Sequence, residues 1–367
     1  MEMDWDISRC DLRIADGKHV VSYFGSCGLV CYDFKGKERW RHPLPVAQTA
    51  GSFGSGTSPV LAEGLVLVNR DQVRNCSLVA VDLKTGKKAW ETPRPDVTQS
   101  FGTPILWKND GVDEVVMSGS LKLKGYQLKT GAERWSLPGV SSFTCTTPVV
   151  GDGLLFFAAW APGKDPGTMI SWEGLAQAAD KNHDGVITPE EAKAAGMGGF
   201  FKAFDVNGDG KLTPEDVELM KAQMAKGENV LLAVKPGGHG DLGPDHVAWK
   251  QTAGLPYVPS PLVYRGRVYL VRDGGMVSSF DAKTGVPYYS KERLGEAGGN
   301  YYASPVAAEG RIYFVSLTGR VSVVEAGGEQ PKILHQANFG ERTCATPALV
   351  GKTIYLRTAS ALFAFGQ

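Results

Sequence analysis

The chain has 367 residues with 39 basic and 39 acidic side chains, so its formal net charge is zero. This balance argues against a broad nucleic-acid surface, which needs clustered basic residues. Apolar residues make up 43% of the chain, yet no apolar run is long enough to cross a bilayer, so we expect a large core and no transmembrane segment. The start, MEMDWDISRC, has neither a basic segment nor an apolar stretch, and we expect no signal peptide in it.

One phrase recurs along the chain: a strand, a turn with Lys and Gly, and a second strand with an aromatic residue four positions after the turn glycine. It reads YDFKGKERW, VDLKTGKKAW, YQLKTGAERW and FDAKTGVPYY, and its aromatic residues are Trp40, Trp90, Trp135 and Tyr289. A Ser-Pro or Thr-Pro pair before a short apolar strand recurs with a period of about 44 residues. The period is broken once, by an excess of about 69 residues.

Four short antiparallel strands in each period predict the blades of an all-β propeller. The units begin near residues 11, 57, 102, 146, 259, 303 and 345, which gives seven blades. The last unit has room for only three strands, so we expect residues 3–7, with Trp5 in the aromatic position, to pair beside the strand near 361–365. An eighth blade outside this chain stays open as an alternative.

The extra residues, about 161–228, fall between the second strand of the fourth blade, GLLFFAAW, and its third strand, NVLLAVKPGG. The sequence therefore predicts three segments. Residues 1–160 form blades one to three and the first part of blade four, and 161–228 form a small helical insert. Residues 229–367 complete blade four and form blades five to seven.

The insert contains DKNHDGVITPEE, which matches the calcium-loop pattern D-x-N-x-D-G-x5-E at every position. Calcium prefers six to eight oxygen ligands, which such a loop supplies from alternate positions and from a carboxylate at position twelve. Gly185 permits the sharp turn at position six, and Thr188 and Pro189 begin the following helix. The predicted ligands of this first loop are Asp180, Asn182, Asp184, Val186 through its carbonyl, Thr188 and Glu191.

A second loop, DVNGDGKLTPED, repeats the design 25 residues later. Its predicted ligands are Asp205, Asn207, Asp209, Lys211 through its carbonyl, Thr213 and Asp216. Asp216 replaces the usual Glu, and its shorter reach favours weaker calcium binding or more magnesium character. Apolar residues at helical spacing flank both loops. An ordinary turn is the alternative interpretation of each loop, but two complete matches with phased helices favour metal binding, in a structural or buffering role rather than a switch.

The repeated phrases LVAVDLKTGKKAW, GLVCYDFKGKERW and LKGYQLKTGAERW resemble the tryptophan-docking repeats of pyrroloquinoline-quinone-type propellers. With its inserted EF-hand pair, the chain is similar to bacterial quinoprotein-like repeat proteins and, in repeat style, to the outer-membrane assembly lipoprotein of the same superfamily. This resemblance implies an extracytoplasmic location, periplasmic or secreted.

Enzymatic members of this superfamily carry an adjacent cysteine pair beside the quinone, and a calcium held in the channel. The six cysteines of this chain include no adjacent pair, and no acidic residue lies in the matching context. We therefore expect a non-catalytic, monomeric binding or scaffold module with bound calcium and without the quinone. A quinone-dependent dehydrogenase that uses the central funnel is the alternative.

In a four-stranded meander, the loop that leads into the first strand and the loop between the second and third strands lie at the same end. We expect these loops to surround a funnel that holds a protein partner or a small ligand. The candidate residues are Phe101, Arg70, Arg272, Asp273, Tyr301, Tyr302 and Arg342. The alternative is that the aromatic rings pack between blades and the charges line solvated loops.

Overall fold

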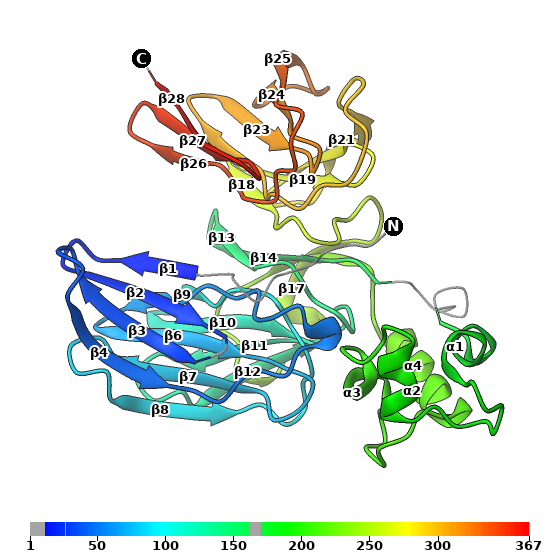
Figure 1. The fold of residues 1–367 in the computed structure, drawn as a ribbon. Coiled ribbons are helices and arrows are strands. Elements are labelled where there is room, and N and C mark those ends of the chain that lie inside the picture. Colours follow the sequence, from blue (N-terminus) through cyan, green and yellow to red (C-terminus); the bar gives the residue numbers. More distant parts are fainter. Residues whose placement is uncertain (1–11, 26, 162–169, 367) are drawn as a thin grey trace. The chain divides into compact units, whose positions relative to one another are not determined.

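The computed structural model describes residues 12–25, 27–161 and 170–366. Seven antiparallel sheets follow one another along these residues (Figure 1), and the fold class is a seven-bladed β-propeller, as the repeat predicts. The chain divides into two compact units: unit 1 is Met1–Thr144 with Ala161–Glu228, and unit 2 is Cys145–Trp160 with Asn229–Gln367. None of the helices in the described ranges is long and apolar enough to span a membrane.

Unit 1 contains the first three blades, each a meander in which neighbouring strands along the chain are hydrogen-bonded neighbours. Blade one is β1 (Leu12–Ala15), β2 (His19–Phe24), β3 (Gly28–Asp33) and β4 (Glu38–Pro43). The short 3-10 helix η2 (Ala50–Ser52) leads into blade two, which is β5 (Val60–Ala62), β6 (Leu65–Arg70), β7 (Ser77–Asp82) and β8 (Lys88–Pro93). Blade three is β9 (Ile105–Asn109), β10 (Val112–Gly119), β11 (Lys122–Gln127) and β12 (Glu133–Pro138).

Unit 2 contains the other four sheets. Blade four is β13 (Val149–Gly151), β14 (Leu154–Ala159), β15 (Val230–Val234) and β17 (Val247–Gln251), with β16 (Gly240–Asp241) and η4 (Pro244–His246) before its last strand. Blade five is β18 (Leu262–Tyr264), β19 (Arg267–Arg272), β20 (Met276–Asp281) and β21 (Pro287–Arg293). Blade six is β22 (Val306–Ala308), β23 (Arg311–Val315), β24 (Arg320–Glu325) and β25 (Ile333–Asn338). The seventh sheet is β26 (Ala348–Val350), β27 (Thr353–Arg357) and β28 (Leu362–Gly366).

The seventh sheet has three strands within the described part of the chain, as the short last unit predicts. The fourth strand was assigned to residues 3–7, which lie outside the described residues, so this closure stays a prediction.

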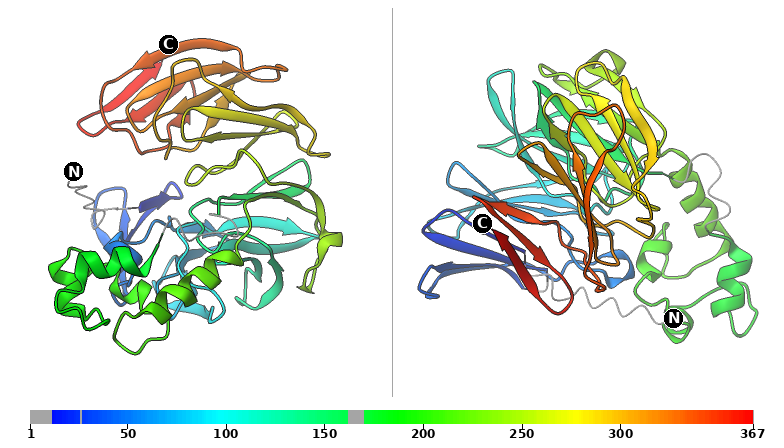
Figure 2. Two further views of the ribbon diagram at one scale, coloured as in Figure 1. Left: turned by 90° about the vertical axis from the view of Figure 1, so that its right-hand side faces the viewer. Right: turned by 90° about the horizontal axis from the view of Figure 1, so that it is seen from above.

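The insert lies between β14 and β15 and belongs to unit 1. Its helices are α1 (Trp172–Ala179), α2 (Pro189–Ala194), α3 (Phe201–Phe204) and α4 (Pro214–Ala225). Helices α1 and α4 carry the apolar residues that the sequence placed on them. The segment before the second loop forms only the single helical turn α3, because Gly198 and Gly199 precede it and glycine disfavours helix. The four helices stay together in one group in all three views (Figures 1 and 2).

The repeated tryptophans dock on the turn glycine of the next blade. The Trp40 Nε1 donates a hydrogen bond to the Leu83 carbonyl at 2.7 Å, and a Cβ on Gly86 would overlap the Trp40 ring. Gly86 also has a φ of +70°, so glycine is required there for both conformation and space. Equivalent contacts join Trp90 to Leu128 and Gly131, and Trp249 to Ala282 and Gly285.

Trp135 departs from this pattern because the fourth blade lacks the K-T-G turn. Its Nε1 donates instead to the carboxylate of Glu114 in its own blade, at 2.7 Å. Glu114 is fully buried, and it also accepts a hydrogen bond from Asn109 and pairs with Arg134 at 2.5 Å. The buried carboxylate is therefore well partnered, as burial of a charge requires.

Candidate metal centre and the loops beside it

The two predicted metal loops face each other through a short antiparallel bridge. The amide of Ile187 donates to the carbonyl of Leu212 at 2.9 Å, and the reverse bond is 3.0 Å. Gly185 and Gly210, both at position six, have φ values of +80° and +83°, where a side chain would be strained. The loops therefore have the paired arrangement that the sequence pattern predicts.

In the first loop, the carboxylate of Asp180 points into the turn and is buried. Its Oδ2 accepts a hydrogen bond from the Gly185 amide at 3.1 Å. Asn182 and Asp184 similarly accept hydrogen bonds from amides of the loop itself, which holds their oxygens on the inner side of the turn. The other oxygen of Asp180, Oδ1, is buried without a hydrogen-bond partner among the described residues.

This Asp180 oxygen is the observation that tests whether the loop fits a cation. A buried carboxylate oxygen that lacks a partner is costly, and a bound cation would remove that cost. The surrounding donors are carboxylate, amide and main-chain carbonyl oxygens, which are the ligands of hard cations such as calcium. The first loop therefore fits the metal that its sequence predicts.

Glu191, at position twelve, forms hydrogen bonds with Thr188, the residue that caps the N-terminus of α2. Its Oε2 accepts hydrogen bonds from the amide and the hydroxyl of Thr188, at 3.0 and 2.9 Å, and the Thr188 amide lowers the pKa of the Glu191 carboxyl. Over residues 12–161 and 170–366, apart from Ser26, no three His, Cys, Asp or Glu side chains converge as a ready set of ligands. To bind a cation with both oxygens, Glu191 would have to turn away from Thr188.

In the second loop, the residue at position twelve is Asp216, and its side chain is more buried than that of Glu191. Its Oδ1 accepts a hydrogen bond from the Val206 amide at 3.1 Å, and its Oδ2 accepts bonds from the amide and hydroxyl of Thr213. Asp216 is only 1% exposed. Asp205 accepts hydrogen bonds from the amides of Gly208 and Gly210. The carboxylate at position twelve is thus held by the amide and hydroxyl of a threonine in both loops, and in the second loop it is almost fully buried.

Replacing Glu191 by alanine should weaken calcium binding at the first loop on the order of tenfold or more, because Glu191 can supply two oxygens. Asp216→Ala should weaken the second loop less, since its shorter side chain supplies one oxygen and serves mainly as an acceptor for amides. Calorimetric titration of both variants with calcium measures the difference. Equal losses in the two variants would contradict the ranking.

The insert has a small core of its own. Its buried residues are Ala179, Ile187, Ala192, Phe201 and Leu212, and Trp172 and Phe204 pack against them. Trp172, Phe201 and Phe204 therefore pack within the pair. Phe200 stacks on Phe204 at 5.7 Å between ring centroids, and its ring also meets the ring of Phe53 edge-on at 5.5 Å.

Phe53 belongs to a set of loops that we call the mouth loops, defined as residues 44–59, 71–76, 94–104 and 139–144 of unit 1. The insert contacts all four. A Cβ on Gly51 would overlap the Phe200 ring. Further contacts are Lys202 to Gln48 at 3.1 Å, Arg74 to the Asp205 carbonyl at 2.7 Å, Gln223 to Thr98 at 3.5 Å, and the Glu228 amide to the Val140 carbonyl at 3.2 Å. The insert is therefore attached to the loops that lead into and out of its neighbouring blades.

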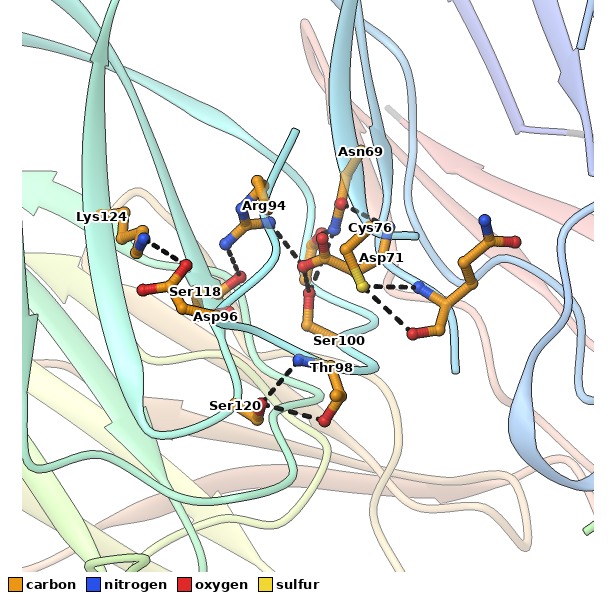
Figure 3. A network of polar contacts seen from close by, with 12 residues as sticks. Asn69, Asp71, Cys76, Arg94, Asp96, Thr98, Ser100, Ser118, Ser120 and Lys124 are labelled. Carbon is orange, nitrogen blue, oxygen red and sulfur yellow. Dashed lines mark hydrogen bonds and ion pairs between the residues drawn. The ribbon is translucent and has the colours of Figure 1, made fainter. Parts of the chain in front are cut away.

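A buried ion pair ties two of the mouth loops together (Figure 3). Arg94 and Asp71 both have fully buried side chains, and the Arg94 Nη1 donates to Asp71 Oδ2 at 2.5 Å. Ser100 donates to the same carboxylate oxygen, and the remaining nitrogens of Arg94 donate to the Tyr126 hydroxyl and the Ser118 carbonyl. The loop that follows β6 is thus fixed to the loop that follows β8.

The repeat pattern in the sequence does not identify Arg94. The available signal was weak: an arginine follows the aromatic strand of blade two at Arg94, and another ends the aromatic strand of blade five at Arg293. In blade five the arginine donates to the Gly274 carbonyl instead.

Of the predicted funnel residues in unit 1, Arg70 is buried at the end of β6 and donates to the Pro45 carbonyl at 2.8 Å. Phe101 lies 5.5 Å from Phe143, between ring centroids. Both residues therefore hold mouth loops in place, and a role in binding a ligand stays a prediction.

Unit 2 holds the other five funnel candidates. Asp273 accepts a hydrogen bond from the Tyr301 amide at 2.8 Å, and Tyr301 is buried in the core between blades five and six. Burial, together with Asp273 and Cys344, raises the pKa of Tyr302. Arg272 ends β19, and Arg342 is exposed. Cys145 also lies in this unit, and burial raises the pKa of its thiol to about 12, so it is protonated and unreactive at neutral pH.

Two parts of the chain match known protein families. Residues 6–160 match the family described as outer membrane protein assembly factor BamB, and residues 177–193 and 199–221 match the EF hand. No curated protein sequence matches the chain significantly.

Three solved structures share the fold, each with too little sequence identity to carry function. BamB from Moraxella catarrhalis has a TM-score of 0.59 at 14% identity, over 95% of this chain and 81% of that chain. The computationally designed Ika8 protein has a TM-score of 0.60 at 12% identity, over 97% and 82%. A europium-containing methanol dehydrogenase has a TM-score of 0.53 at 12% identity, over 97% and 76%. The resemblance drawn from the repeats is thereby confirmed: the fold is that of a propeller, residues 6–160 resemble the BamB family, and the insert matches the EF hand.

Proposed function

We propose that this protein is a calcium-binding, non-catalytic module that binds a protein partner at its mouth loops, with the EF-hand pair holding those loops in place. The observation that carries the proposal is the attachment of the insert to all four mouth loops, through Phe200, Lys202, Arg74, Gln223 and Glu228. A cation that stabilises the insert also stabilises what the insert holds, by mass action.

The matched family supports the choice of partner and location. It is described as an outer membrane protein assembly factor. We therefore assign a protein, rather than a small molecule, to the mouth loops, and an extracytoplasmic location to the chain. The likeness to a methanol dehydrogenase rests on 12% identity and supports the fold alone.

Calorimetric titration of the whole chain with calcium should show two binding events. Adding pyrroloquinoline quinone and calcium should produce no dye reduction with alcohols or sugars. Absence of calcium binding at millimolar concentration would refute the metal part of the proposal. Quinone-dependent dye reduction would refute the non-catalytic part.

Photo-cross-linking tests the binding surface. A cross-linking residue at Asn75, which is exposed in a mouth loop, should capture one protein partner in calcium and less of it in chelator. The matched control is Lys84, which is exposed in the turn between β7 and β8, outside the mouth loops. Equal capture from both positions would contradict a partner site at the mouth loops.

A further inference from the structure

Arg74 reaches from the propeller onto the second metal loop. Its Nη2 donates a hydrogen bond to the main-chain carbonyl of Asp205, the first residue of that loop, at 2.7 Å. A Cβ on Gly208, at position four, would overlap the Arg74 guanidinium, so the charged group lies directly against the turn. The φ of Gly208 is +79°, and glycine therefore serves both the turn and the approach of the arginine.

The loop that receives this guanidinium is acidic. Asp205, Asp209 and Asp216 supply three carboxylates, and Lys211 supplies one opposing charge. A guanidinium stays charged at every physiological pH. Arg74 therefore places a permanent positive charge at the rim of a site that attracts cations.

The arginine also belongs to a firmly held loop. The amide of Val73 donates to the Gln48 carbonyl at 2.8 Å, and the amide of Gln99 donates to the Gln72 carbonyl at 3.0 Å. At the start of the same loop, Asp71 forms the buried pair with Arg94. Because its backbone is anchored on both sides, Arg74 cannot withdraw from the second loop without loss of these contacts.

We propose that Arg74 acts as a tethered competitor for the cation of the second loop, so that the propeller lowers the affinity of this one site. The inference rests on the proposed calcium binding. Repulsion between a single and a double positive charge on the order of 10 Å apart in water corresponds to roughly a threefold to tenfold change in affinity. By linkage, a cation in the second loop weakens the hold of Arg74 by the same factor. Cation binding at the first loop then stabilises the insert, and cation binding at the second loop sets the strength of the contact between Arg74 and the insert.

The test uses the full chain with Glu191→Gln, which weakens the first loop and leaves the second to be measured by calorimetric titration with calcium. In this background Arg74→Gln should raise the calcium affinity about threefold to tenfold at low ionic strength. The gain should shrink in 0.5 M salt, because screening weakens charge repulsion. Arg74→Lys keeps the charge and should restore an affinity close to that of the arginine protein. Arg41→Gln, which removes an exposed charge from β4, is the matched control and should change nothing.

The outcomes separate this inference from the proposed function. If the unmodified chain binds no calcium at either loop, the proposed function fails. If it binds calcium, but Arg74→Gln leaves the affinity of the second loop within twofold or lowers it, Arg74 orders the loop instead of competing with the cation, and the inference alone fails. An affinity in Arg74→Lys as high as that in Arg74→Gln would also overturn the electrostatic account.

Hydrogen exchange supplies a readout that does not depend on affinity. Saturating calcium should protect the amides of residues 72–76 less in the protein that keeps Arg74 than in Arg74→Gln, because the cation weakens the hold of Arg74 on the second loop while it stabilises the rest of the insert. A response of equal size in both proteins would contradict the role of Arg74.

Discussion

Replacing Arg94 by methionine should lower the free energy of unfolding of this protein by about 3–5 kcal/mol, among the largest effects of any single substitution outside the core. The change leaves the Asp71 carboxylate buried with Ser100 as a donor but without its counter-charge. An unpaired buried charge is far more costly than the loss of the attraction itself. Urea unfolding followed by tryptophan fluorescence measures the shift.

Two further variants show that the effect comes from the stranded charge. The double variant Asp71→Leu with Arg94→Met removes both charges and should recover most of the lost stability, because apolar residues of similar volume can replace a buried pair. Arg41→Met breaks an exposed pair with Glu38 and should leave the unfolding midpoint unchanged. A loss below about 1 kcal/mol in Arg94→Met would show that water reaches Asp71 readily.

Removing calcium with a chelator should increase hydrogen exchange strongly across residues 172–225, while the central strands of the blades keep their protection. The insert core is small, with five buried residues, and cannot contribute much stability without bound metal. Within each unit, neighbouring blades share apolar clusters, such as the one that joins β2 and β3 to β6 and β7 in unit 1. Exchange followed by mass spectrometry, with and without chelator, measures the difference.

The loop that precedes β5 of blade two provides a control for this second prediction. Residues 50–53 lie against Phe200 and should lose some protection with the insert. The turn at residues 83–87 belongs to the same blade, makes none of the insert contacts described above, and should not respond. Uniform loss of protection over every blade would mean that the metal supports the entire fold, and no change anywhere would mean that the loops bind no calcium.

Much of the fold follows from short-range patterns in the sequence. The period of about 44 residues, with an aromatic residue four positions after a turn glycine, is sufficient to predict blades and their order. The structure adds the reason for the phrase. Trp40 docks on Gly86 of the following blade, so the tryptophan of one repeat can pack only where the next repeat has a glycine in its turn. Where the fourth blade lacks the turn, Trp135 instead docks on Glu114, which the repeat could not predict.

The two loops and their candidate ligands were also predictable from the sequence, since a twelve-residue loop sets its glycine turn through local geometry; metal binding itself stays a prediction. The attachment of those loops to the propeller was not. Arg74 and Asp205 are separated by 131 positions, and the buried pair Asp71 and Arg94 by 23. Such contacts depend on where blade ends and insert lie in space, which no local spacing encodes. The sequence by itself therefore determined the repeat, the blade number and the candidate metal ligands, because each arises within one turn or one strand. Only the tertiary structure decided which loop charges are buried in pairs and which one reaches the second metal loop, because burial and charge pairing depend on neighbours that are distant along the chain.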